Sequence, residues 1–295
     1  MTRIAYFDCF SGVSGDMTLG ALLDAGLPLE VLLAALDKLT VHEFELEAYP
    51  VLKQGISATQ VVVRAQEGHV HRGLPEIRAI IQGSELPEPV KASSLAVFTE
   101  LAKAEAAIHG STLEEVHFHE VGAVDAIVDI VGACFGLHWL GIEKIICSPL
   151  PTGGGQARSA HGIIPIPAPA TLALLASRQV PLYDNGQRIE LVTPTGAALM
   201  VALADSFGGY PAFRPERVGY GAGQKDLSVA NVLRIVLGEA VEQGAGRSTD
   251  HEHRHDHRHP QGHHHDHSHE HSHEHSHRHE HDHDHEHEYT HEHGR

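Results

Sequence analysis

The pattern of apolar positions at the start of the chain is first a continuous run and then a helical spacing. Residues 4–7 (IAYF) form an apolar run that ends at Asp8, a pattern typical of a buried strand. Leucines then recur at helical spacing after Asp16. Because Asp is a good N-cap residue and glycine a common terminator, the pattern predicts a helix from Asp16 to Gly26.

The same criteria predict elements along the rest of the chain. Predicted helices cover residues 28–39, 75–81, 89–108, 170–176 and 197–204, and another begins near Gly122 with the apolar stripe Val124, Ile127, Val128 and Val131. Predicted strands cover residues 44–48, 60–63, 145–147 and 232–237. Strands that alternate with helices indicate an α/β or α+β fold for a globular body.

Three segments rich in glycine or proline are predicted as loops. Residues 148–169 end in three prolines spaced by single residues, which exclude a regular strand or helix there. Residues 191–196 (LVTPTG) resemble this segment and lead into a helix. Residues 220–223 (YGAG) are predicted to form a glycine-rich turn.

The last part of the sequence has a different pattern. Residues 251–295 alternate His with Glu, Asp or Ser and contain almost no apolar residue. Because nothing in such a segment offsets its ordering entropy, we expect it to be disordered. We divide the chain into a folded body, residues 1–245, and a metal-binding tail, residues 246–295. A cloning tag is the alternative, although tags are usually pure His blocks.

Composition narrows the possible partners. The 295 residues carry 21 Lys and Arg against 39 Asp and Glu, a formal charge of −18, which argues against nucleic acid or an anionic membrane as the main partner. There is no apolar run of about 18 residues that would predict a transmembrane helix, and the N-terminus lacks the pattern of a signal peptide. Cys9, Cys134 and Cys147 have no CxxC spacing, so we expect reduced, mostly buried thiols and a cytoplasmic protein.

The first candidate site is the loop from Asp8 to Asp16. Its small residues allow backbone N–H groups to face a phosphate at a helix start, and its two carboxylates could hold a hard cation. The residues expected to bind the ligand are Ser11, Gly12, Ser14 and Gly15. The alternative is a capped turn between strand and helix.

The second candidate site is the segment 116–129 (VHFHEVGAVDAIVD). If residues 116–119 are extended, His117 and His119 point to the same side, and the helical spacing places Asp125 and Asp129 on one face. Imidazoles and carboxylates together suit a divalent metal such as Ni, Zn or Mn. The predicted ligands are His117, His119, Glu120, Asp125 and Asp129.

A third candidate site combines residues 152–162 with residues 193–196. Glycines allow a close backbone approach to an anion, and an arginine offers a planar fork for phosphate or carboxylate. The residues expected to bind are Gly153, Gly154, Gly155, Arg158, Thr193 and Thr195, with His161 as a general acid or a ligand. Two tight structural loops are the alternative. A weaker cluster is formed by His69, His71 and Arg72, where a solvated turn is the simpler interpretation.

These motifs together resemble the LarC family of nickel insertion proteins. The matching stretches lie within residues 3–238, at 6–17 (YFDCFSGVSGDM), 116–129, 148–155 (SPLPTGGG), 161–162 (HG), 167–170 (PAPA) and 193–196 (TPTG). The resemblance implies a lyase-type chelatase that inserts nickel into pyridinium-3,5-bisthiocarboxylic acid mononucleotide, forming a carbon–nickel bond flanked by two thiocarboxylate sulfurs. It also implies dependence on CTP with Mn²⁺ or Mg²⁺, and a His-rich stretch after the N-terminal domain.

Chemical reasoning assigns roles to the candidate residues. We expect Asp8, Asp16, His117, His119, Glu120 and Asp125 to converge on one catalytic site, because separate clusters so rich in ionisable groups are hard to justify structurally. Metallation displaces protons, so His117, His119 or His161 is a reasonable base. In the tail, the expected nickel ligands include His251, His253, His255, His257, His263, His264, His265 and His267.

The sequence departs from the family pattern at its end. Full-length members continue with a second domain linked to CTP binding, whereas this chain stops at Arg295. We therefore expect it to represent an N-terminal half, which is a split-gene product with a separately encoded C-terminal half, a frameshift product or an incomplete gene model. A homo-oligomer is also expected. Two other classes stay open: a nickel storage protein or metallochaperone without catalysis, and a metal-dependent phosphate-ester or nucleotide hydrolase built on the Asp8–Asp16 loop.

Overall fold

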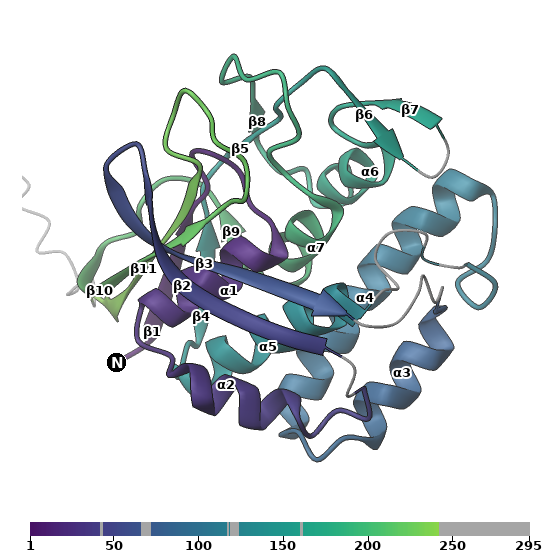
Figure 1. Cartoon of the computed structure of the whole chain (residues 1–295), viewed down its shortest axis with the longest axis horizontal. Helices are drawn as coiled ribbons and strands as arrows, with labels where there is room; N and C mark the ends of the chain where they lie inside the picture. The colour runs from purple at the N-terminus through teal and green to yellow at the C-terminus, as the bar shows by residue number, and fades with distance from the viewer. Residues whose placement is uncertain (42–43, 66–71, 117, 119–123, 160–161, 242–295) are drawn as a thin grey trace, which may run out of the picture. The chain divides into compact units, whose positions relative to one another are not determined.

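The computed structural model describes residues 1–41, 44–65, 72–116, 118, 124–159 and 162–241. Within these residues the sheet has seven strands in the order β2 (Phe44–Lys53), β3 (Ile56–Ala65), β10 (Phe213–Ala222), β11 (Val232–Ala240), β1 (Arg3–Asp8), β4 (Lys144–Cys147) and β9 (Ser206–Phe207). The helices are α1 (Gly15–Asp24), α2 (Leu29–Leu36), α3 (Leu74–Gly83), α4 (Glu88–His109), α5 (Val124–Trp139), α6 (Pro169–Ser177) and α7 (Pro194–Leu203). The expected α/β fold is confirmed (Figure 1).

The sheet is mixed. Strand β1 pairs in parallel with β4 and antiparallel with β11, and β4 continues in parallel to β9. Strand β10 pairs antiparallel with β11 and in parallel with β3, and the β2–β3 hairpin closes that side. Two small two-stranded sheets lie outside it: β5 (Leu150–Pro151) with β8 (Leu182–Tyr183), and β6 (Gln156–Ser159) with β7 (Gly162–Pro165).

The two faces of strand β1 are buried differently. Ala5 and Phe7 are fully buried in the large core that also contains the helices, whereas Ile4 and Tyr6 belong to a small separate apolar cluster. Successive side chains of a strand point to opposite faces, so this division marks which face the helices cover. Helix α1 lies against β3, β10 and β11 on the covered face (Figure 1).

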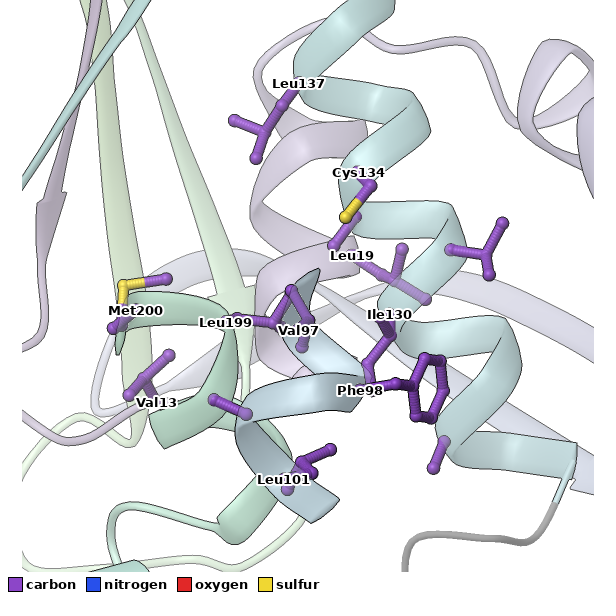
Figure 2. Close-up of a cluster of buried hydrophobic side chains, with 14 of the residues drawn as sticks. Val13, Leu19, Val97, Phe98, Leu101, Ile130, Cys134, Leu137, Leu199 and Met200 are labelled. Atoms are coloured by element: carbon purple, nitrogen blue, oxygen red, sulfur yellow. The ribbon is translucent and has the colours of Figure 1, made fainter. Parts of the chain in front are cut away.

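The helices share one interior. Figure 2 shows side chains from four helices turned toward one another: Leu19 of α1, Val97 and Phe98 of α4, Ile130 and Cys134 of α5, and Leu199 of α7. All six are at most 3% exposed. Burial of such side chains contributes most of the free energy that holds the layers together. The packing therefore fixes where α1, α5 and α7 begin relative to one another.

The expected reduced and buried state of the three cysteines is confirmed. Cys9, Cys134 and Cys147 are buried and free of disulfides. Cys9 Sγ lies 3.8 Å from Cys147 Sγ at the ends of neighbouring strands. None of the described helices has the length and apolar character needed to cross a membrane.

The structure corrects several predicted boundaries. Helix α1 begins at Gly15 and its N-cap is Ser14, whose side chain accepts from the backbone N–H of Met17, so Asp16 lies in the first turn instead. Helix α7 begins at Pro194, because Thr193 is its cap and proline suits the first helical position. The segment 148–169, expected as a loop, contains β5 and the β6–β7 hairpin.

The predicted turn at residues 220–223 is wrong. Residues 220–222 are the end of strand β10, and its glycines serve helix packing rather than chain reversal. A Cβ atom at Gly221 would lie 1.8 Å from the carbonyl oxygen of Met17, and one at Gly219 would lie 2.1 Å from that of Ala21. Glycine is therefore needed for the backbone of α1 to approach this strand.

A Gly221→Ala variant is expected to lower the free energy of unfolding by about 1–3 kcal/mol or more. The added Cβ would clash with the backbone oxygen of Met17, and no change of side-chain rotamer relieves such a clash. Denaturant unfolding of the full chain measures the loss. Gly208→Ala is the matched control, since a Cβ there meets nothing within 4 Å. Equal stability of the two variants would contradict the packing role of Gly221.

Candidate functional site

Two of the predicted loops meet in the structure. Val13 and Val192 form a parallel bridge, in which the Val13 N–H donates to Leu191 O at 2.9 Å and the Thr193 N–H donates to Val13 O at 3.1 Å. Glycine allows this contact: a Cβ at Gly12, whose φ is +105°, would lie 2.0 Å from Leu191 O. The N-termini of α1 and α7 therefore start side by side.

A cavity of about 360 Å³ opens beside these helix starts. Its walls come from the first turns of α1 and α7, the N-terminal part of α5, strand β3 and the connection between β10 and β11. The polar residues that line it are Ser14, Asp16, Asp125, Asp129, Glu190, Thr193, Thr195, Gln224, Lys225 and Asn231. The end of the first candidate loop, the helical part of the second and the threonines of the third therefore converge on one cavity.

Asp16 is oriented by its neighbours. Its Oδ1 accepts hydrogen bonds from the Ser14 hydroxyl and from the Met17 N–H, the latter at 2.9 Å. Its Oδ2 accepts from Gln224 Nε2 at 3.3 Å. The carboxylate thus links the N-terminus of α1 to the β10–β11 connection across the cavity.

Asp129 is the most unusual group of the cavity. Its side chain lies directly against Gly15, where a Cβ atom would be 2.3 Å from Oδ2. Its Oδ1 is shielded from solvent and accepts no hydrogen bond from the described residues. Burial raises the pKa of the Asp129 carboxyl well above its ordinary value, and the nearby carboxylates of Asp16 and Asp125 raise it further.

The threonines of the second loop have different surroundings. The Thr193 hydroxyl accepts from the Gly196 N–H at 3.1 Å and so caps α7. Thr195 lines the cavity and is only 9% exposed, yet the described residues provide no hydrogen-bond partner for its hydroxyl. The Thr195 hydroxyl is therefore available to a ligand in the cavity.

Asp8 lies apart from the cavity. Its Oδ2 accepts from Arg234 Nε at 3.0 Å and from the Tyr210 hydroxyl at 3.1 Å. Asp8 alternates with Phe7 along β1, so it projects on the sheet face that carries Tyr6, away from α1. This corrects the expectation that Asp8 shares a site with Asp16 and Asp125; its catalytic role stays a prediction.

The glycines of the third candidate also lie outside the cavity lining. A Cβ at Gly153 would lie 2.1 Å from Ile189 O, and Gly154 and Gly155 pack against Arg188. These glycines are used for packing of one loop on another, and Arg158 is exposed on β6. Ser11 and Gly12 are buried and do not line the cavity.

Several predicted residues lie outside the described part of the chain. These are His117, His119, Glu120, His161, the weaker pair His69 and His71, and the tail with His251, His253, His255, His257, His263, His264, His265 and His267. Their roles stay predictions, as does the domain boundary near residue 245. Among the described residues, no group of three His, Cys, Asp or Glu side chains is arranged to hold a metal ion.

Four polar residues of the cavity were not predicted from the sequence: Glu190, Gln224, Lys225 and Asn231. The last three belong to the connection that joins β10 to β11. A strand prediction over 213–222 would have identified this connection as a hairpin loop next to the α1 start. Gly219 and Gly221, which allow the close approach of α1, made this segment look like a turn rather than a strand.

Comparison with known proteins identifies the family. Residues 5–272 match the family described as "Nickel insertion protein". The chain is 56% identical over 245 residues to the "Pyridinium-3,5-bisthiocarboxylic acid mononucleotide nickel insertion protein" of Desulfitobacterium hafniense, a match that covers 83% of this chain and 60% of that protein. It is 54% identical over 242 residues to a "Putative nickel insertion protein" of Synechococcus elongatus, covering 81% of this chain and 60% of that protein.

No solved structure matches this chain. The chain spans about 60% of the length of these curated relatives, so the comparison concerns the part of those proteins that contains the cavity loops. The resemblance carried by the motifs of these loops is confirmed by the match over residues 5–272. On this evidence the chain belongs to the nickel insertion protein family.

Proposed function

We propose that this chain carries the nickel insertion chemistry for pyridinium-3,5-bisthiocarboxylic acid mononucleotide, as a lyase-type chelatase in the cytoplasm. The relatives' names supply the substrate. The observation that carries the proposal is the cavity, which is lined by three aspartates and by the starts of two adjacent helices. Such a cavity offers ligands for a divalent cation beside groups that attract an anion.

The carboxylates suit the cation side of the reaction. Asp16, Asp125 and Asp129 repel one another, which is the reason that the pKa of Asp129 is raised beyond the effect of burial. A divalent ion bound beside them reduces this repulsion and offers a partner to the shielded Asp129 Oδ1. The three aspartates alone are not arranged to hold a metal ion, so in the proposed role they supply only part of the ligands for nickel, the metal substrate. The predicted ligands His117, His119 and Glu120 supply the others.

The reaction also needs a proton acceptor. Insertion breaks the C–H bond of the pyridinium carbon between the two thiocarboxylates and forms a C–Ni bond, so a proton leaves the ring. A carboxylate of the cavity or one of the predicted bases His117, His119 and His161 accepts it. CTP, with Mn²⁺ or Mg²⁺, completes the proposed set of reactants. A separately encoded C-terminal half and a homo-oligomer are the proposed protein partners.

The test is nickel insertion by the purified full chain. The mononucleotide precursor and Ni²⁺ are supplied, CTP and Mg²⁺ or Mn²⁺ are added or omitted, and a polypeptide corresponding to the rest of the relatives is added or omitted. We expect the nickel-bearing product by mass spectrometry only when CTP and the divalent ion are present. Failure of every combination to give product would refute the proposal.

A nickel carrier without catalysis is the second candidate. It is favoured by the 21 His among residues 251–295, which supply many imidazoles for Ni²⁺. The same assay separates the two functions, because a carrier binds nickel but leaves the precursor unchanged. The third class, a phosphate-ester hydrolase, would instead release phosphate from CTP or from the precursor in the absence of nickel.

A further inference from the structure

The connection between β10 and β11, residues 223–231, is held in place beside the cavity. Lys53 Nζ, at the end of β2, contacts Asp226 Oδ1 at 2.7 Å and donates to Gln224 O at 3.4 Å. Lys53 is only 8% exposed. Because a buried ammonium is costly unless it is paired, this contact ties the connection firmly to the β2–β3 hairpin.

A second set of bonds fixes the base of the connection. The Gly223 N–H donates to Asn231 O at 2.9 Å, and Asn231 Nδ2 donates to Lys225 O at 2.8 Å. Asn231 is 8% exposed, and a Cβ at Gly223 would lie 2.5 Å from its Nδ2. The backbone of Lys225 is therefore positioned by a buried amide at the cavity wall.

The Lys225 side chain has no assigned partner. It lines the cavity and is exposed, and within the described ranges it forms no ion pair, in contrast to Lys53, Lys91 and Lys103. A lysine held at the backbone and unpaired at its ammonium group is suited to binding an anion from solution.

The rest of the cavity shows which anion fits. The starts of α1 and α7 line it, and so does Thr195, a residue only 9% exposed whose hydroxyl forms no hydrogen bond with the described residues. Helix N-termini, a hydroxyl and an ammonium group together match the oxygens of a phosphate. A phosphate alone would be repelled by Asp16 and Asp125, so it must enter with a divalent cation.

We propose that the β10–β11 connection is a phosphate-recognition element, in which Lys225 binds the phosphate group of a mononucleotide in the presence of a divalent cation. The choice of this mononucleotide rests on the proposed function. The assignment separates the cavity into a phosphate side, with Lys225 and Thr195, and a cation side, with Asp16, Asp125 and Asp129.

The experiment measures binding rather than turnover. Dissociation constants of the full chain are determined by calorimetry, with Mg²⁺ present and nickel absent, for the mononucleotide precursor and for the same compound without its phosphate. The variants are Lys225→Gln, Lys225→Arg and the control Lys144→Gln, which removes an exposed lysine from β4. Thermal unfolding confirms that each variant is folded.

Lys225→Gln is expected to weaken binding of the phosphorylated compound about tenfold to a hundredfold, the range for hydrogen bonds to a charged group, and to leave binding of the dephosphorylated compound unchanged. Lys225→Arg should retain most of the affinity, and Lys144→Gln should equal the wild type. An equal effect of Lys225→Gln on both compounds, no effect on either, or no binding of the mononucleotide by the wild type would overturn the inference. Phosphate-dependent binding without nickel insertion would refute the proposed function and leave this inference standing.

Discussion

An Asp129→Asn variant is expected to be at least as stable as the wild-type chain at neutral pH and to lose nickel insertion activity by about a hundredfold or more. The side chain lies against Gly15 with a shielded Oδ1 that has no described partner, so its charge is a cost to the folded chain. Asn keeps the shape and removes the charge. It also removes an oxygen ligand of the proposed cation site, and removal of one group at a metal site lowers affinity or activity by at least about ten- to a hundredfold.

The pH dependence of stability gives an independent measure. The pKa of Asp129 in the folded chain is well above its ordinary value, chiefly because of burial. Between the unfolded pKa, about 3.9, and this raised pKa, the folded chain binds a proton that the unfolded chain has released. The free energy of unfolding therefore falls as pH rises through that interval. Above the raised pKa of Asp129, the free energy of unfolding has fallen by its full amount, and the titration of this carboxyl changes it no further.

The variant should show a flatter profile, because Asn does not titrate. Denaturant unfolding at several pH values in metal-free buffer compares wild type, Asp129→Asn and the control Asp37→Asn, which alters an exposed carboxylate at the end of α2. Full insertion activity in Asp129→Asn would rule out the metal role. A marked loss of stability in it would show that the carboxylate has a structural partner.

The aspartates of α5 illustrate what the sequence could predict. Asp125 and Asp129 are four residues apart on an otherwise apolar helix, and this spacing alone places both on one face. The strands over 4–7 and 232–237 were also predictable, because each is an apolar run whose length suits a buried strand. The spacing of residues along the sequence was sufficient to predict a feature when a single helix or strand contains all of its residues.

Asp8 shows where local spacing fails. Its distance from Asp16 along the loop suggested a shared site, but the parity of β1 places it with Tyr6 rather than with Phe7. The alternation of side chains along β1 locates Asp8 relative to the cavity only when it is known which face of the sheet the helices cover. The same holds for Lys225, which reaches the cavity because β10 packs on α1 through Gly219 and Gly221. Such contacts between distant segments carry no local sequence signal.

Deletion of residues 251–295 is expected to remove most of the nickel-binding capacity of the chain and to leave insertion intact when nickel is plentiful. The deleted segment carries 21 of the 29 His and almost no apolar positions from which a preformed site could be built. Ligands that must be ordered at each binding event bind with modest affinity and release the metal readily. Many such imidazoles near the body raise the local nickel concentration without taking part in the reaction.

The matched control keeps the length and the acidic residues of the tail and replaces its His residues by Asn. Nickel stoichiometry is measured by equilibrium dialysis for the full chain, the deletion and this control, and insertion is measured at limiting and at saturating nickel. The deletion and the Asn control should both bind few ions and be slow only at limiting nickel. Unchanged stoichiometry after deletion, or loss of insertion at saturating nickel, would contradict a delivery role.

Nickel binding by the tail should also depend on pH in a defined direction. An imidazole with an ordinary pKa of about 6.5 is a neutral ligand above that pH and a cation below it, and only the neutral form binds a metal. Acidification adds positive charge to a chain whose formal charge is −18 with its 29 His neutral, so Ni²⁺ is both displaced by protons and repelled. Dialysis at neutral and mildly acidic pH should therefore show a large loss of bound nickel in the full chain and little change in the Asn control. If the two proteins lost the same amount of nickel, the carboxylates rather than the imidazoles would be the ligands.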